Sequence, residues 1–265
     1  MGSVGVPKDD EFTILVTGFG PFKDQYPINP SWEIARSLPE YLPADRVKDP
    51  AHQTSDTPLL SPRRRVRILV HPAPVRVNYE VVRGLVPSLW DDDDDPEGCG
   101  GRVDAVLHIG MAGPQRVYQV ERRAHRDGYL IKDVDGLLLD DERRRREAGG
   151  DEGWIWEGLP TELLSDLNVD DIHKRWVEHC PKGLDLRISE DPGRYLCDFI
   201  YYSSMAHLTK QSRPRKVVFL HVPCDQSQEV IKSGVEIATQ LIRSIAESEM
   251  ASKKPAEAEQ EAHVK

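Results

Sequence analysis

The sequence has few cysteines and no long hydrophobic run. Its 265 residues include only 4 cysteines, and no two of them form the Cys-x-x-Cys pair that is typical of zinc sites and redox centres. We therefore expect free thiols, as in a cytoplasmic protein, and neither a metal nor a cofactor. No segment approaches the roughly 20 apolar residues that a membrane-spanning helix needs, and the first residues contain no apolar signal segment. The sequence thus predicts no membrane association.

Positive charge is scarce relative to negative charge. The chain has 35 lysines and arginines against 45 aspartates and glutamates, which gives a net charge of −10. This excess of negative charge disfavours binding to nucleic acid or to anionic membranes. With 38% hydrophobic and 30% charged residues, the composition predicts a globular core with charged surface segments.

Three polar or charged stretches interrupt the apolar segments, near residues 44–65, 91–101 and 140–158. We expect them to be surface insertions. Residues 251–265 are rich in Ala, Glu and Lys without a core-forming pattern, which predicts a disordered C-terminal tail. For the remainder, residues 1–250, the sequence predicts a single domain.

Short apolar runs alternate with helical patterns along the chain. The runs are apolar throughout rather than alternating with polar residues, which is typical of parallel strands covered on both faces. This order predicts an α/β fold, a three-layer α/β/α sandwich around a mostly parallel, twisted sheet. The predicted strands are 11–16, 66–70, 103–109, 184–188 and 217–220, and the predicted helices are 32–38 with Ser31 as N-cap, 79–89, 197–208 and 227–247.

One cysteine, Cys197, follows a turn and precedes a helical pattern. The sequence SEDPGRYLCDF places an Asp-Pro-Gly turn signal before it. Apolar residues with helical spacing follow, so Cys197 is expected at or near the start of a buried helix. The positive end of the helix dipole would favour a thiolate there. The alternative is a buried structural cysteine, because free cysteine is among the most buried residue types.

Two further residues could act with a cysteine nucleophile. His221 stands at the end of the strand 217–220, and ligands of open α/β sheets bind at the carboxyl ends of strands. A histidine at this position is a candidate general base. Glu121 lies in a segment of alternating polarity, where its neighbours alone suggest a surface ion pair with Arg122 or Arg123.

The loop after the first predicted strand, TGFGPF, contains two glycines but lacks the third glycine of a dinucleotide-binding loop. Pro21 also has no N–H group to offer a phosphate. Phe19 and Phe22 instead suggest the wall of an apolar pocket.

Four blocks in this order resemble the pyroglutamyl-peptidase I family, cysteine peptidases that remove an N-terminal pyroglutamate (pyrrolidone-carboxylate peptidases, peptidase family C15). The blocks are VTGFGPF with NPSW, GMAG followed by VERRAHRDGY, SEDPGRYLCDFIYYSS, and FLHVP. The resemblance implies a catalytic triad of Cys197 as nucleophile, His221 as base and Glu121 as the acid that orients the imidazole. It also implies a thioester acyl-enzyme and, as substrates, peptides with an N-terminal pyroglutamate.

The resemblance further implies a substrate pocket. Phe19 and Phe22 would form its walls, Asn29 would shape the loop, and Tyr195 and Leu196 would flank the nucleophile. Met111 stands where many bacterial relatives have glutamine, so a polar side chain would be missing near the pocket.

Two other functions stay open at this point. The expected fold also resembles that of nucleoside phosphorylases, but a phosphorolytic enzyme needs a phosphate site, and no glycine-rich basic loop stands out. A non-catalytic family member that binds modified peptide N-termini is the second alternative. The sequence leaves the oligomeric state undetermined.

Overall fold

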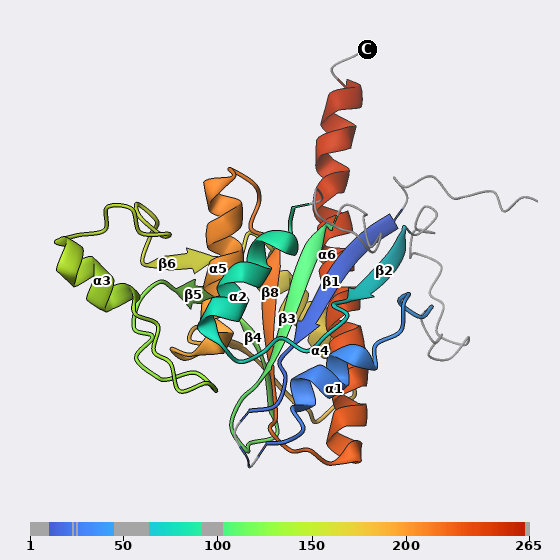
Figure 1. The fold of residues 1–265 in the computed structure, drawn as a ribbon. Coiled ribbons are helices and arrows are strands. Elements are labelled where there is room, and N and C mark those ends of the chain that lie inside the picture. The colour runs from blue at the N-terminus through green and yellow to red at the C-terminus, as the bar shows by residue number, and fades with distance from the viewer. Residues whose placement is uncertain (1–10, 23, 25, 45–63, 92–102, 263–265) are drawn as a thin grey trace, which may run out of the picture.

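In a computed structural model, the protein is built around a six-stranded sheet (Figure 1). The structure describes residues 11–22, 24, 26–44, 64–91 and 103–262, so the predicted insertions near 44–65 and 91–101 lie almost entirely outside the described residues. The strand order is β2-β1-β3-β8-β4-β7, and every neighbouring pair is parallel except β8 and β4, which confirms a mostly parallel sheet. The strands are β1 (Glu11–Gly18), β2 (Arg65–Val70), β3 (Ala105–Met111), β4 (Val117–Glu121), β7 (Asp185–Ser189) and β8 (Val217–Val222).

Helices cover both faces of this sheet, which confirms the three-layer α/β/α architecture. One face packs against α1 (Pro30–Arg36), α4 (Val169–His179) and α6 (Gln228–Ala262). The opposite face packs against α2 (Tyr79–Ser88) and α5 (Leu196–Lys210). Among the helices in the described part of the chain, none combines the length and the apolar composition that crossing a membrane requires.

A short helix and a two-stranded sheet extend the layer that contains α5. β5 (Arg123–His125) pairs with β6 (Glu162–Leu164), and α3 (Asp141–Ala148) lies in the charged segment between them. The sequence predicts a surface insertion here, yet Trp156 is buried, with its ring centroid 4.7 Å from that of Tyr202 on α5. Part of this segment therefore belongs to the core.

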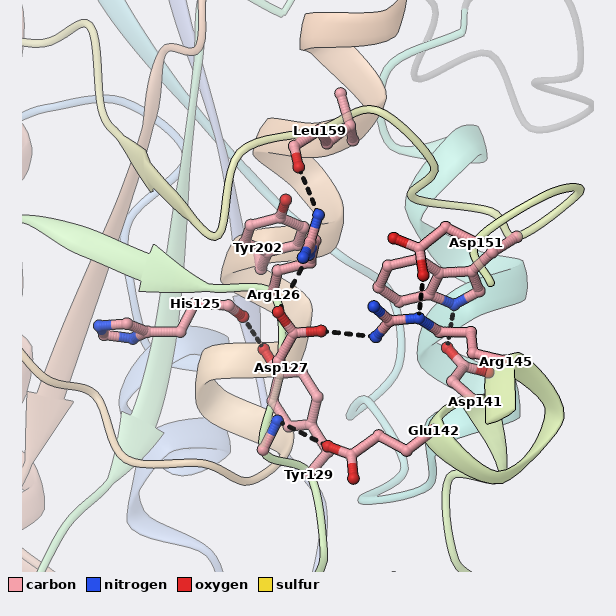
Figure 2. Close-up of polar contacts among 12 residues, drawn as sticks. His125, Arg126, Asp127, Tyr129, Asp141, Glu142, Arg145, Asp151, Leu159 and Tyr202 are labelled. Atoms are coloured by element: carbon pink, nitrogen blue, oxygen red, sulfur yellow. Dashed lines mark hydrogen bonds and ion pairs between the residues drawn. The ribbon is translucent and has the colours of Figure 1, made fainter. Parts of the chain in front are cut away.

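Ion pairs hold the charged segment against the chain that follows β5 (Figure 2). Arg145 of α3 donates to Asp127 at 2.7 Å and to Asp151 at 2.6 Å, and its guanidinium lies 3.9 Å from the ring centroid of Trp154. Asp141 is buried, and it accepts hydrogen bonds from Arg83 and from the Trp154 indole. A buried carboxylate is tolerated here because charged and polar donors replace its water shell.

Helix α1 begins earlier than predicted and α6 ends later. The N-cap of α1 is Asn29 and not Ser31, because the Asn29 side chain accepts a hydrogen bond from the Ser31 backbone N–H at 3.1 Å. Pro30 then occupies the first helical position, where its missing N–H costs nothing. At the other end of the chain, the backbone of α6 continues to Ala262, through residues that the sequence predicts as a tail.

A buried histidine joins the sheet to α5. His108 of β3 is 0% exposed, with Nδ1 2.8 Å from Thr17 Oγ1 and Nε2 2.9 Å from Ser204 Oγ. Burial lowers the pKa of His108 to about 3. The imidazole is therefore neutral at neutral pH, and its protonation would put an unpaired charge into the core.

We expect His108 to make the fold sensitive to acid. Its pKa in the unfolded chain, 6.5, exceeds its folded pKa, so the unfolded chain binds more protons and stability falls as the pH drops below 6.5. The loss should approach about 1.4 kcal/mol per pH unit. Urea unfolding at pH 7 and pH 5 measures it, and the free energy of unfolding should fall less in H108Q than in the wild type. Equal losses in both proteins would contradict this role.

Candidate active site

The candidate nucleophile Cys197 lies in the first turn of α5. Before the helix, Gly193 adopts a φ of +86°, which favours glycine, and its N–H donates to Asp191 at 3.0 Å. Tyr195 is the N-cap residue, and its side chain makes no capping hydrogen bond in the described structure. The first N–H groups of a helix have no intrahelical acceptor, so this uncapped start favours negative charge on the Cys197 sulfur.

Strand geometry directs three residues towards α5. Side chains alternate along a strand, and Leu220 of β8 and Val120 of β4 belong to the core beneath α6. Their neighbours His221 and Glu121 therefore point to the α5 side. Gly110 of β3 pairs directly with His221 and shares this face.

Glu121 and His221 are joined by a buried hydrogen bond. His221 Nδ1 donates to Glu121 Oε1 at 2.7 Å, and Glu121 is only 1% exposed. The other ring nitrogen remains for Cys197, which also hydrogen-bonds with His221. Burial lowers the pKa of His221, but the negative charges and hydrogen bonds of Cys197 and Glu121 outweigh it and raise the pKa to about 10. The imidazole is therefore positively charged at neutral pH.

The arginines next to Glu121 pair with other carboxylates. Arg122 bonds Asp170 at 2.7 Å and Glu190 at 2.8 Å, and Arg123 bonds Glu190 as well. The surface ion pair that the neighbours of Glu121 suggest is therefore wrong. The alternation of β4 turns Glu121 into the interior while the arginines that follow reach the surface.

A pocket lies beside Cys197, and seven of its eight lining residues are those that the sequence comparison with the family implies. Asn29 shapes it from the first loop by donating to the Gly20 carbonyl at 2.8 Å. The eighth residue, Val77, follows β2 in a stretch without a recognisable motif. The lining consists of Phe19, Phe22, Asn29, Val77, Met111, Tyr195, Leu196 and Cys197.

Tyr195, part of the aromatic wall of this pocket, is held in place by a neighbouring ring and by a hydrogen bond. The Tyr195 ring lies 5.7 Å from that of Phe22, and its hydroxyl donates to the Lys132 carbonyl at 3.1 Å. Burial, together with the charges of Asp133 and Cys197, raises the pKa of Tyr195 to about 12, so the hydroxyl remains a donor at neutral pH. The Tyr195 side of the pocket is thus held by a bond to the backbone of Lys132.

Gly110 makes room for the sulfur. A Cβ atom at this position would lie 2.9 Å from Cys197 Sγ and 2.6 Å from Cζ of Phe219. Both distances are shorter than the non-bonded contacts that a Cβ atom makes in proteins. The sequence motif GMAG contains this glycine, but only the structure shows what its missing side chain accommodates.

This arrangement defines the class of protein: an α/β enzyme with a cysteine-centred site between α5 and the inner strands of its sheet. In the described residues, no group of three or more His, Cys, Asp or Glu side chains could hold a metal ion. A family model for pyroglutamyl peptidase matches residues 100–248, more than half of the chain. The chain belongs to this family of cysteine peptidases.

Known members support the assignment. Pyroglutamyl-peptidase 1 of Mus musculus is 29% identical over 210 residues, which cover 79% of this chain and 78% of the mouse protein. Pyrrolidone-carboxylate peptidase of Pyrococcus furiosus is 28% identical over 221 residues, covering 83% and 85%. Among solved structures, the pyrrolidone carboxyl peptidase from Thermococcus litoralis has a similar fold, with a TM-score of 0.63, 18% identity and coverage of 91% and 96%.

We expect Gly110→Ala to displace the Cys197 sulfur while the fold persists. The added methyl group would push Sγ away from His221, so alkylation of Cys197 by iodoacetamide should slow by about tenfold or more. Mass spectrometry of the labelled peptide measures the rate. Gly113→Ala is the matched control, because a Cβ atom there meets nothing within 4 Å. Unchanged labelling of G110A would show that the sulfur does not need this space.

Proposed function

We propose that this protein hydrolyses the amide bond that follows an N-terminal pyroglutamyl residue of peptides, with Cys197, His221 and Glu121 as its catalytic triad. The observation that carries the proposal is the 2.7 Å bond between His221 Nδ1 and Glu121 Oε1, with Cys197 at the other side of the same imidazole. The family of the chain and the names of its relatives supply the substrate class.

In the first step, the Cys197 thiolate attacks the carbonyl carbon of the pyroglutamyl residue. The carbonyl oxygen gains a negative charge, which backbone N–H groups of the first turn of α5 would stabilise. The protonated His221 gives its proton to the leaving amine as the C–N bond breaks. The products are a free peptide amine and a thioester between Cys197 and the pyroglutamyl group.

In the second step, water hydrolyses this thioester. His221, now neutral, accepts a proton from the water as its oxygen bonds to the carbonyl carbon. The C–S bond then breaks, and pyroglutamate leaves. Glu121 keeps the Nδ1–H of the imidazole in place through both steps and stabilises the imidazolium, as the third member of such triads generally does.

The pocket suits a neutral lactam ring. Of its eight lining side chains, none carries a formal charge apart from the reacting thiolate, and Phe19, Phe22 and Tyr195 are aromatic. A pyroglutamyl residue has no α-ammonium group, so it needs no carboxylate partner. Met111 adds a further apolar contact where many bacterial relatives have glutamine, so we expect recognition of the lactam to depend more on backbone groups in this protein.

Release of a fluorescent amine from pyroglutamyl-aminomethylcoumarin tests the reaction. In the presence of a thiol reductant, the wild type should release the amine, and Cys197→Ala should reduce kcat/KM by at least about a thousandfold, as loss of a nucleophile does. If the folded wild type binds pyroglutamyl peptides without cleaving them, the protein is a non-catalytic member that recognises modified N-termini.

The pH profile tests the part played by Glu121. In the wild type the charged imidazole should persist until its pKa of about 10, so the alkaline limb of kcat/KM should lie near that pH. Glu121→Gln removes a neighbouring negative charge, so the pKa of His221 should fall and the alkaline limb should move down by about one pH unit or more. Glu190→Gln is the control, since this exposed carboxylate pairs with Arg122 and Arg123 instead. An alkaline limb that is the same in E121Q and the wild type would exclude Glu121 as the partner of the imidazolium.

A further inference from the structure

A second buried acid–imidazole pair lies next to the candidate nucleophile. Asp198 directly follows Cys197 in α5 and is 0% exposed. Its Oδ2 lies 3.4 Å from Nδ1 of His125, the last residue of β5. Neither residue touches the reacting atoms in the mechanism above, so their burial needs another explanation.

Asp198 connects α5 to the chain that continues from Glu121. Its Oδ1 accepts a hydrogen bond from the backbone N–H of His125 at 2.9 Å. Three residues further along α5, the Tyr201 hydroxyl donates to the backbone carbonyl of Glu121 at 3.0 Å. The two bonds attach one face of the helix to both ends of the segment 121–125. They therefore fix how the first turn of α5 is rotated about the helix axis, and where it lies along that axis, relative to Glu121.

Further bonds hold the end of this segment and the residue that follows it, as Figure 2 shows. The Tyr129 hydroxyl donates to the His125 carbonyl, and Arg126 donates to the Leu159 carbonyl at 2.6 Å. The His125 imidazole points away from this network in the view. The backbone that bonds Asp198 is thus attached to other parts of the chain as well, so a movement of α5 would strain its bond to Asp198.

The two carboxylate oxygens of Asp198 have unequal partners. Oδ1 makes the short bond to the His125 backbone, whereas Oδ2 has ion-pair neighbours, His125 Nδ1 at 3.4 Å and Arg194 Nη1 at 3.7 Å. Burial raises the pKa of Asp198, and the bonds from His125 oppose that effect. At 2.9 Å the backbone bond is the shortest of these three contacts, and an amide oxygen could accept it equally well.

We propose that Asp198 is a positioning residue, which sets the Cys197 sulfur against His221 by bonding α5 to the backbone of His125. The proposal rests on the function proposed above. Its physical basis is that a displacement of about 1 Å between reacting groups can cost about a hundredfold in rate. Asp198 is in the same helical turn as Cys197, so a shift of that turn moves the sulfur directly.

Three variants test this role by steady-state kinetics. Asp198→Ala should lower kcat by about 10- to 100-fold and leave KM within about twofold, since the pocket walls remain but the sulfur shifts. Asp198→Asn keeps the acceptor for the His125 N–H and should recover kcat to within about threefold of the wild type. Asp141→Asn is the matched control, because Asp141 is another buried carboxylate, bonded to Arg83 and Trp154 away from the pocket.

The rate of iodoacetamide labelling of Cys197 provides a readout that needs no substrate, so it separates a failure of this proposal from a failure of the proposed function. Labelling should slow in D198A and recover in D198N. A kcat or labelling rate of D198A equal to that of the wild type would overturn the proposal. So would equal losses in D198A and D141N that follow their melting temperatures, because that pattern indicates a purely structural role.

If D198A does not fold, Tyr201→Phe provides the second variant. It removes only the hydroxyl that bonds the Glu121 carbonyl and leaves the ring in the core. Its kcat and labelling rate should fall by about threefold or more, the effect of losing one hydrogen bond. Wild-type values for both would overturn the idea that these bonds position the nucleophile.

Discussion

The site depends on one reversal of direction in the sheet. All neighbouring strands are parallel except β8 and β4, and the register there pairs Gln119 with His221. Glu121 is then the diagonal neighbour of His221 on the same face, a separation that long side chains can bridge. The result is the 2.7 Å bond between carboxylate and imidazole. Everything else at the site, including the start of α5 and the space left by Gly110, is arranged around that bond.

Glu121 and His221 also need each other electrostatically in the folded protein. A carboxylate that is 1% exposed loses nearly all its hydration, and only an opposite charge with good hydrogen bonding makes its ionised form acceptable. The positive charge of His221 interacts with Glu121 and with Cys197 together, so the charge of this imidazole depends on both neighbours. Removing any one member leaves the others buried without their partner. This coupling links residues that come from β4, α5 and β8.

Much of this could be predicted from the sequence because the signals are local. Apolar runs identify buried strands, and short blocks around Cys197, His221 and Phe19 imply the pocket. At the start of α1 the sequence offers two good N-cap residues, Asn29 and Ser31. Only Pro30 between them, which suits the first helical position, favours Asn29. The antiparallel pairing of β4 and the bond from Asp198 to His125 have no local signature, because they join residues far apart in the chain. Helix α4 does have a local signature, the helical spacing of the buried residues Ile172 and Trp176, but no recognisable motif accompanies it.

The charged segment between β5 and β6 supports the site, although its composition alone does not indicate this. Arginines and carboxylates dominate it, as is typical of a solvated insertion, yet several of these residues bond particular partners. Arg145 spans Asp127 and Asp151, and Glu142 accepts from the backbone of Gly128 (Figure 2). These bonds fix the chain between β5 and the loop that braces Tyr195 through the Lys132 carbonyl. The same stretch of backbone therefore bonds α5 at His125 and Tyr195 at Lys132, so that one segment connects the helix of Cys197 to the aromatic side of the pocket.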